Sequence, residues 1–223
     1  MKNNILVIAV HPDDETLGCG GTLFKHKAKG DSVHWMIVTS IKEEYGFAAS
    51  AIEARRQEIE AVSSTYDFDG VYALDFPTMQ LDDIPFRKLI SSISDVFKKV
   101  EPNIVYLPFK GDVHTDHQVV LKAAYSCTKI FRCPSIKKIM MMETLSETEF
   151  APSTKEDSFV PNMFVDITDF IDRKIEIMNI YKSELAEHPF PRSERNIRAL
   201  ATFRGATAGC EYAESFMILK EIV

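Results

Sequence analysis

The 223-residue sequence has few cysteines, and the four that it has follow no known pattern. They are spaced neither as a C-x-x-C metal knuckle nor as a dense disulfide framework. The four are Cys19, Cys127, Cys133 and Cys210. This spacing predicts free thiols in a reducing compartment.

Long hydrophobic runs are missing as well. No apolar stretch approaches the ~20 residues that a membrane span needs. Residues 1–4 lead into a strand-like run without the hydrophobic region and cleavage site of a signal peptide. We therefore expect a cytoplasmic protein with no membrane span. Because no repeat, low-complexity tract or linker interrupts the sequence, we also expect one domain over residues 1–223.

Positive charge is in deficit. The chain has 26 Lys and Arg against 33 Asp and Glu, for a formal net charge of -7. An acidic surface repels phosphates unless a basic face is segregated from it, and no such basic run occurs. The composition predicts no nucleic-acid partner.

Apolar runs of strand length alternate with segments of helical period. Strands are expected at residues 5–10, 33–39, 70–74, 103–109, 136–143 and 163–167, and helices at 17–29, 51–65, 83–100, 118–130, 168–185 and 193–204. The strand runs are nearly continuously apolar, which is typical of parallel strands buried on both faces. The pattern predicts an α/β fold with a mostly parallel sheet flanked by helices. The polar stretch 146–157 is expected to be a surface loop.

The first chemical signal follows the first strand, at residues 11–15 (His-Pro-Asp-Asp-Glu). Three consecutive carboxylates at a buried strand end would cost several kcal/mol each without a counter-charge, so a divalent cation is expected there. His11 offers an imidazole, which zinc favours, and one of the two aspartates offers an oxygen. The other aspartate is then free to handle protons.

A second cluster, residues 114–117 (His-Thr-Asp-His), follows the fourth expected strand. The carboxyl ends of parallel strands share one edge of a sheet, so the two clusters can meet across a crevice. Two histidines and one carboxylate with an open position form the ligand set of a catalytic zinc. Such an ion can lower the pKa of a water to ~7, and a nearby carboxylate can take its proton.

Each cluster alone has a simpler explanation. Acidic residues after a proline often only cap a helix and favour its first turn. Two histidines in a polar loop are more often solvent-exposed than metal ligands. The metal hypothesis depends on the conjunction of both clusters at strand ends.

Together these residues resemble the zinc-dependent LmbE-like (PIG-L) N-acetylglucosaminyl deacetylases. The resemblance is carried by residues 11–15, by Gly20-Gly21 and by His114-x-Asp116-His117. Further segments similar to landmarks of this family are Arg55-x-x-Glu58, Tyr181-Lys182-Ser183, Arg204-Gly205 and residues 212–216. The resemblance spans almost the whole chain and implies a Rossmann-like α/β sandwich.

The resemblance also implies a role for each residue of the two clusters. The metal ligands would be His11, Asp14 and His117, with Zn²⁺ as the ion and Fe²⁺ as an alternative. Asp13 would be the general base that activates a metal-bound water. His114, oriented by Asp116, would carry positive charge near the developing oxyanion and then protonate the leaving amine.

Substrate contacts are implied less directly. Arg55 would hold a hydroxyl or an anionic part of the substrate. Arg204 and Glu214 are substrate-binding candidates because they match the family landmarks, and they rank above His188, Arg192 and Tyr212 for that reason alone.

The sequence leaves several functions open. The first is removal of acetate from an N-acetylated amino sugar or its conjugate, a small-molecule substrate; the second is a zinc amidase for a thiol-conjugate or other acyl-amide. A non-catalytic sugar-binding protein is the third. Nucleotide binding is disfavoured because a G-x-G-x-x-G motif from Gly18 would need glycine at position 23, which is Leu23. The glycines at 18, 20 and 21 are instead expected to let the backbone pass close to residues 11–15, here called the metal loop. Homo-oligomers are common in the family that the chain resembles.

Overall fold

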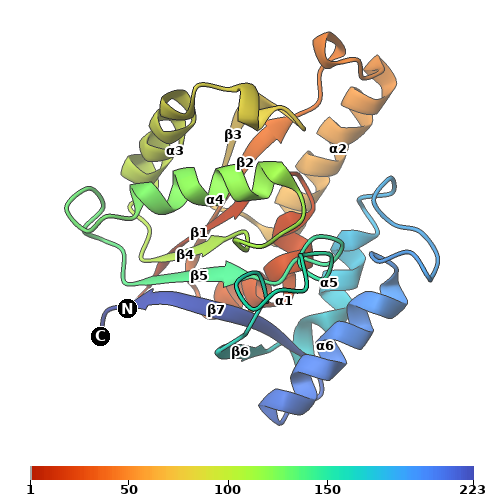
Figure 1. The fold of residues 1–223 in the computed structure, drawn as a ribbon. Coiled ribbons are helices and arrows are strands. Elements are labelled where there is room, and N and C mark those ends of the chain that lie inside the picture. Colours follow the sequence, from red (N-terminus) through yellow and green to blue (C-terminus); the bar gives the residue numbers. More distant parts are fainter. Residues whose placement is uncertain (1) are drawn as a thin grey trace.

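A computed structural model describes residues 2–223, and in it one seven-stranded sheet runs through the molecule (Figure 1). The strands are β1 Asn4–Ala9, β2 Ser32–Ser40, β3 Gly70–Pro77, β4 Ile104–Leu107, β5 Lys138–Met142, β6 Met163–Asp166 and β7 Ala213–Glu221. Their order across the sheet is β3-β2-β1-β4-β5-β7-β6. The first five are parallel, and β7 pairs antiparallel with both β5 and β6.

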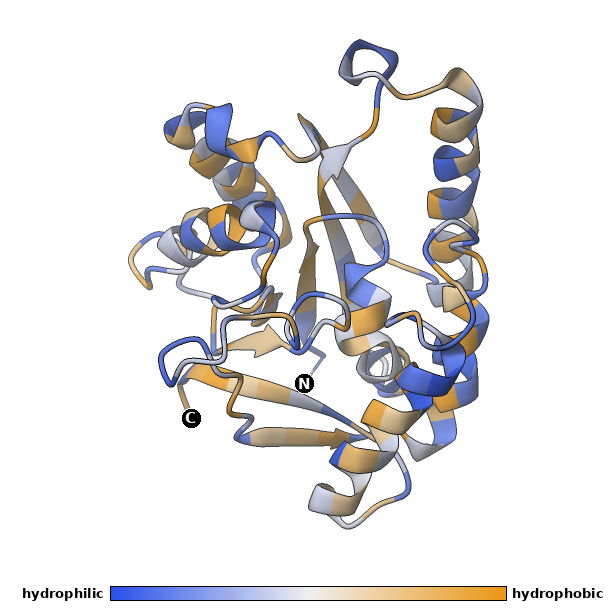
Figure 2. Cartoon of the chain, turned by 45° about the vertical axis from the view of Figure 1, so that its right-hand side comes forward, coloured by the Kyte–Doolittle hydropathy of each residue, from blue (hydrophilic) through white to orange (hydrophobic). Residues whose placement is uncertain are grey.

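Helices cover both faces of this sheet. They are α1 Asp14–Ala28, α2 Ala49–Tyr66, α3 Phe86–Val100, α4 Thr115–Cys127, α5 Ile171–Met178 and α6 Glu194–Ala208, with 3-10 turns η1 Glu43–Tyr45, η2 Leu81–Asp83 and η3 Thr168–Phe170. Alternate side chains of β1 enter two cores: Leu6 and Ile8 pack with α3 and α4, whereas Ile5 and Val7 pack with α1, α2 and α5. Figure 2 shows the apolar strands between helices of mixed hydropathy. The predicted α/β sandwich is confirmed.

Most boundaries shift by a few residues from the sequence-based expectation, and three of these shifts have a clear location in the fold. β3 continues through Pro77, because its edge position leaves no ladder partner for the missing proline N–H. α5 ends at Met178, well before the expected 185, and Tyr181 turns inward to donate to Glu15. α6 passes the expected end at 204 and continues to Ala208. Within residues 2–223, no helix combines the length and the apolar character that a membrane crossing requires.

The glycines after the first acidic cluster have a different role from the expected one. They lie within α1 and permit close helix packing. A Cβ on Gly20 would stand 2.7 Å from the Tyr66 hydroxyl, and one on Gly21 would stand 2.7 Å from Cβ of Ile167. They therefore seat α1 against its neighbours and do not bring the backbone close to the metal loop.

The topology brings the two chemical clusters together. β1 pairs with β4, and the chain leaves them toward α1 and α4 on opposite faces. This is the switch point of the sheet, where α/β proteins bind ligands outside the carboxyl ends of the strands. Residues 11–15 and 112–117 therefore meet at one edge.

Candidate active site

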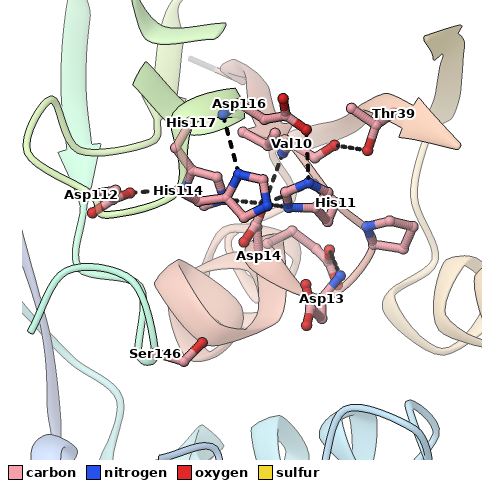
Figure 3. Close-up of polar contacts among 12 residues, drawn as sticks. Val10, His11, Asp13, Asp14, Thr39, Asp112, His114, Asp116, His117 and Ser146 are labelled. Atoms are coloured by element: carbon pink, nitrogen blue, oxygen red, sulfur yellow. Dashed lines mark hydrogen bonds and ion pairs between the residues drawn. The ribbon is translucent and has the colours of Figure 1, made fainter. Parts of the chain in front are cut away.

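The turn between β1 and α1 holds two adjacent aspartates in different orientations (Figure 3). Asp13 has φ 136° and ψ −27°, a conformation that costs a non-glycine residue of order 1–3 kcal/mol. Asp14 follows with Oδ2 accepting hydrogen bonds from the N–H groups of Val10 (2.9 Å) and His11 (2.8 Å). The strained turn thereby fixes Asp14 toward the histidines while Asp13 lines the adjacent cavity.

His11, Asp14 and His117 form a candidate metal centre. One ligand atom from each lies within 4.8 Å of the others. The fully buried Nε2 of His117 has no hydrogen-bond partner and stands 3.4 Å from Asp14 Oδ2. Burial alone would lower the pKa of His117, but the Asp14 and Asp112 carboxylates outweigh it and raise this pKa to about 9. An unpaired imidazole nitrogen in a field that favours positive charge fits a divalent cation.

Asp112 is a residue that the sequence analysis missed. Its Oδ2 lies 2.9 Å from Nδ1 of His117 and accepts the Phe109 N–H, while Oδ1 accepts the Thr148 hydroxyl at 2.7 Å. Metal-binding histidines commonly donate their second ring N–H to a carboxylate, which fixes the tautomer. The available signal was an aspartate five residues before a proposed ligand.

We expect Asp112→Asn to weaken metal binding about 10- to 100-fold, because the amide no longer fixes the tautomer that points Nε2 at the metal. Zinc affinity would be measured by competition with a chromogenic chelator. Asp95→Asn, an exposed aspartate on α3, is the matched control and should leave affinity unchanged. Equal affinities for Asp112→Asn and the wild type would show that Asp112 does not orient the ligand.

His114 and Asp116 form a second, overlapping group with His11. The Asp116 carboxylate accepts the N–H groups of Met79 (2.7 Å) and Leu81 (3.2 Å) and lies 3.4 Å from Nε2 of His11. Its oxygens are therefore largely engaged. It is the backbone N–H of Asp116, and not its carboxylate, that contacts Nδ1 of His114.

This contact indicates the resting protonation state of His114. Because Nδ1 accepts a hydrogen bond, the ring proton is on Nε2 and the imidazole is neutral. Burial and the neighbouring imidazoles of His11 and His117 lower the pKa of His114, in agreement with this state. His114 is therefore neutral in this structure, and the positive charge that the resemblance implied for the reaction stays a prediction.

The Glu15 carboxylate stabilises the strained backbone of Asp13. Its carboxylate accepts the Asp13 N–H at 3.1 Å and hydroxyl donors from Thr16 at 2.6 Å and Tyr181 at 2.9 Å. Burial raises the pKa of Glu15 to about 7. Burial also raises the pKa of Asp13, with Asp14 and Glu184 adding to the rise. In the metal-free protein, Asp13 therefore holds a proton more tightly than an exposed aspartate.

A cavity of about 880 Å³ opens beside these groups. His11, Asp13, Asp14 and His114 line the end next to the candidate metal centre, and Arg55 lines the cavity from α2. The Arg55 guanidinium donates to the Pro12 carbonyl at 2.8 Å, pairs with Glu58 at 3.2 Å and pairs with Glu184. Arg55 therefore ties the metal loop to α2, and the chain itself occupies much of its donor capacity.

Arg192 lines the same cavity, although the sequence ranked it below Arg204 and Glu214. It donates to the Ser146 hydroxyl at 2.9 Å and to the Glu184 carboxylate at 3.0 Å. Ser146 and Glu147, from the expected surface loop, also reach the cavity. This part of the wall comes from loops distant in sequence.

Arg204 and Glu214 do not line this cavity. Arg204 pairs with Glu143 after β5, through Nε at 2.8 Å and a second contact. Glu214 is buried, and its oxygens accept the N–H groups of Gly21 and Thr22 and the Lys174 ammonium. Their positions give both residues a structural role in place of the substrate contact expected of them.

The fold and the site together define an α/β protein with a potential metal centre at the switch point of its sheet. A family model described as GlcNAc-PI de-N-acetylase, PIG-L, matches residues 6–128. The match covers more than half of the chain, so the chain belongs to this family. By family it is an N-deacetylase.

Relatives cover nearly the whole chain. The diacetylchitobiose deacetylase of Thermococcus kodakarensis is 27% identical over 98% of this chain and 84% of its own. A conserved protein of Thermus thermophilus, TT1542, superposes with a TM-score of 0.78 at 25% identity, over 99% of this chain and 96% of that one. An N,N'-diacetylchitobiose deacetylase from Pyrococcus horikoshii superposes with a TM-score of 0.77 at 22% identity, over 97% of this chain and 83% of that one.

Proposed function

We propose that this protein hydrolyses the acetyl amide of an N-acetylated amino sugar or its conjugate, with Zn²⁺ at His11, Asp14 and His117. The observation that carries the proposal is the unpaired, buried Nε2 of His117 facing Asp14 beside an open cavity. Similarity to diacetylchitobiose deacetylases supports the sugar as the class of substrate.

The ligand set suits a catalytic ion. Two imidazoles and one carboxylate leave further positions open, as in catalytic zinc sites. When bound, such an ion polarises a carbonyl and lowers the pKa of a water. Fe²⁺ accepts the same ligands, and direct metal analysis decides between the two.

The chain's own residues supply the proton chemistry. Asp13, with its raised pKa, accepts the proton of the attacking water as the water oxygen bonds to the amide carbon. The neutral His114 donates its Nε2–H toward the developing oxyanion. Asp13 then returns the proton to the amine nitrogen as the C–N bond breaks, and acetate leaves.

Acetate release tests the proposal. We expect the zinc-loaded protein to release acetate from N-acetylglucosamine or N,N'-diacetylchitobiose. A chelator should abolish the release, because it removes the ion that His11, Asp14 and His117 are proposed to hold. Zinc added back should restore turnover. Stoichiometric zinc with no acetate from either substrate would contradict the sugar assignment while leaving the metal site in place.

A further inference from the structure

The cavity has two parts of different chemical character. The first, here the polar subsite, is lined by Ser146, Glu147, Ser183, Glu184 and Arg192. The second, the apolar subsite, is lined by Ile37, Ile41, Phe47, Ile52, Ile59 and Val71. The proposed removal of an acetyl group assigns no role to the apolar subsite.

The apolar subsite is a long groove between α2 and the face of β3. On β3, Val71, Ala73 and Asp75 share this face, and they span roughly 13 Å at the rise of a strand. On α2, Ile52 and Ile59 are two turns apart, or roughly 10 Å. Val71 is 38% exposed, so the groove is open to an occupant.

Charged side chains beside the groove are engaged by other parts of the chain. Arg55 and Glu58, on α2, are tied to the segment 182–184: Arg55 contacts Ser183 and Glu184, and Glu58 accepts the Lys182 N–H. Asp75 stands at the end of β3 that is nearer the catalytic residues. Lys42 also lines the cavity, with its ammonium donating to the Asp75 carbonyl at 3.5 Å, and an occupant of the groove meets apolar side chains at the six positions named above.

Ser146 and Glu147 of the polar subsite lie on the opposite side of the metal centre from the apolar subsite, whereas Ser183 and Glu184 contact Arg55 on α2. The apolar subsite is built on β2 and β3, which precede β1 in the sheet order, whereas Ser146 and Glu147 follow β5, beyond β4. Figure 3 shows Thr39, at the end of β2, and Ser146 on opposite sides of the histidine cluster. A substrate whose amide lies at His11 and His114 must extend one substituent to each side.

This arrangement gives a separate position to each half of an amide, the amino sugar and the acyl group. Sugar hydroxyls match the polar subsite, which places the acyl group toward the apolar subsite. We infer that the apolar subsite binds N-acyl chains longer than acetyl on an amino sugar. The inference rests on the proposed function and extends it: water adds to the acyl carbon, the C–N bond breaks, the amine keeps the returned proton, and a longer carboxylate leaves.

An acyl-length series tests this inference. N-acetyl-, N-butanoyl- and N-hexanoyl-glucosamine share one sugar and differ only in the acyl chain. A fully buried methylene is worth about fourfold in binding, so we expect kcat/KM for hexanoyl to exceed that for acetyl by roughly tenfold or more. Val71→Asp places a charge in the groove and should bring this ratio down to about one.

Val160→Asp is the matched control, because Val160 is 63% exposed and does not line the cavity. It should keep the wild-type ratio. Ile52→Ser gives an independent test from α2, and melting temperatures report whether each variant is folded. Both groove variants should lower the hexanoyl to acetyl ratio.

The remaining outcomes are distinct. Equal kcat/KM values for the three N-acyl glucosamines, with acetate still released, would overturn this inference alone. If none of the three substrates were hydrolysed, the proposed function itself would be overturned. A phenyl aglycone could instead raise kcat/KM, with equal values along the acyl series. If Val71→Asp abolished that increase, the groove would be assigned to the aglycone. A change of oligomeric state in Val71→Asp with an unaltered ratio would assign it to a second copy of the chain. Either result overturns the acyl assignment.

Discussion

Asp13→Asn is expected to lower kcat/KM for acetate release by about 10²- to 10⁴-fold, the usual contribution of a positioned general base. The reason is that the amide cannot accept the proton of the attacking water. Metal content should stay at the wild-type level, because His11, Asp14 and His117 are intact and Asp13 faces the cavity. Steady-state kinetics and metal analysis of the purified variant test both parts.

The same variant is expected to be more stable than the wild type. Asparagine carries no charge beside Asp14 and Glu184, so it removes the repulsion that burial strengthens at this position. The folded state raises the pKa of Asp13 above 3.8, so the unfolded chain ionises first as pH rises, and the wild type loses stability from about pH 3.8 upward. The stability advantage of Asp13→Asn should therefore be absent below this pH and grow above it in metal-free protein.

Asp67→Asn is the matched control, because Asp67 also has positive φ (56°) but is exposed at the end of α2. It should leave kcat/KM unchanged and should show no stability advantage that grows with pH. Full turnover by Asp13→Asn with metal bound would show that another group is the base.

Glu214→Ala is expected to destabilise the fold by about 3–5 kcal/mol, because it leaves the buried Lys174 ammonium without its counter-charge. Glu214 and Lys174 are buried beside a break in α1, where Cys19 has non-helical backbone angles (φ −150°, ψ 22°). Beyond the break, the N–H groups of Gly21 and Thr22 donate to Glu214 at 2.9 and 2.7 Å. Lys174 donates to the Leu17 carbonyl before it at 2.9 Å. Denaturant unfolding measures the loss.

Glu221→Ala offers a control on the same strand. Its carboxylate pairs with Lys138 at 2.6 Å near the surface, so we expect a loss below about 1 kcal/mol. The double variant Lys174→Met/Glu214→Leu should cost less than the sum of its single changes, because it removes both charges. If Glu214→Ala kept its stability and lost turnover instead, the substrate role expected from sequence would be restored.

The sequence alone determined the alternation of strands and helices and the residues most suited to hold a metal. Continuous apolar runs are local signals, because a strand buried on both faces must be apolar throughout. His11 and Asp14 are likewise nominated by a short segment after such a run. Both conclusions depend on neighbours in the chain, which a sequence displays directly.

Only the tertiary structure decided which partner each of these groups meets. Asp112 lies against the ring of His117 while the Asp116 carboxylate contacts His11 and the N–H groups of Met79 and Leu81, although both aspartates lie within five residues of His117. Arg192 reaches the cavity, whereas Glu214 is buried under α1, because β7 inserts antiparallel between β5 and β6. Contacts across tens to hundreds of residues select among similar charged side chains, and local spacing carries no record of that selection.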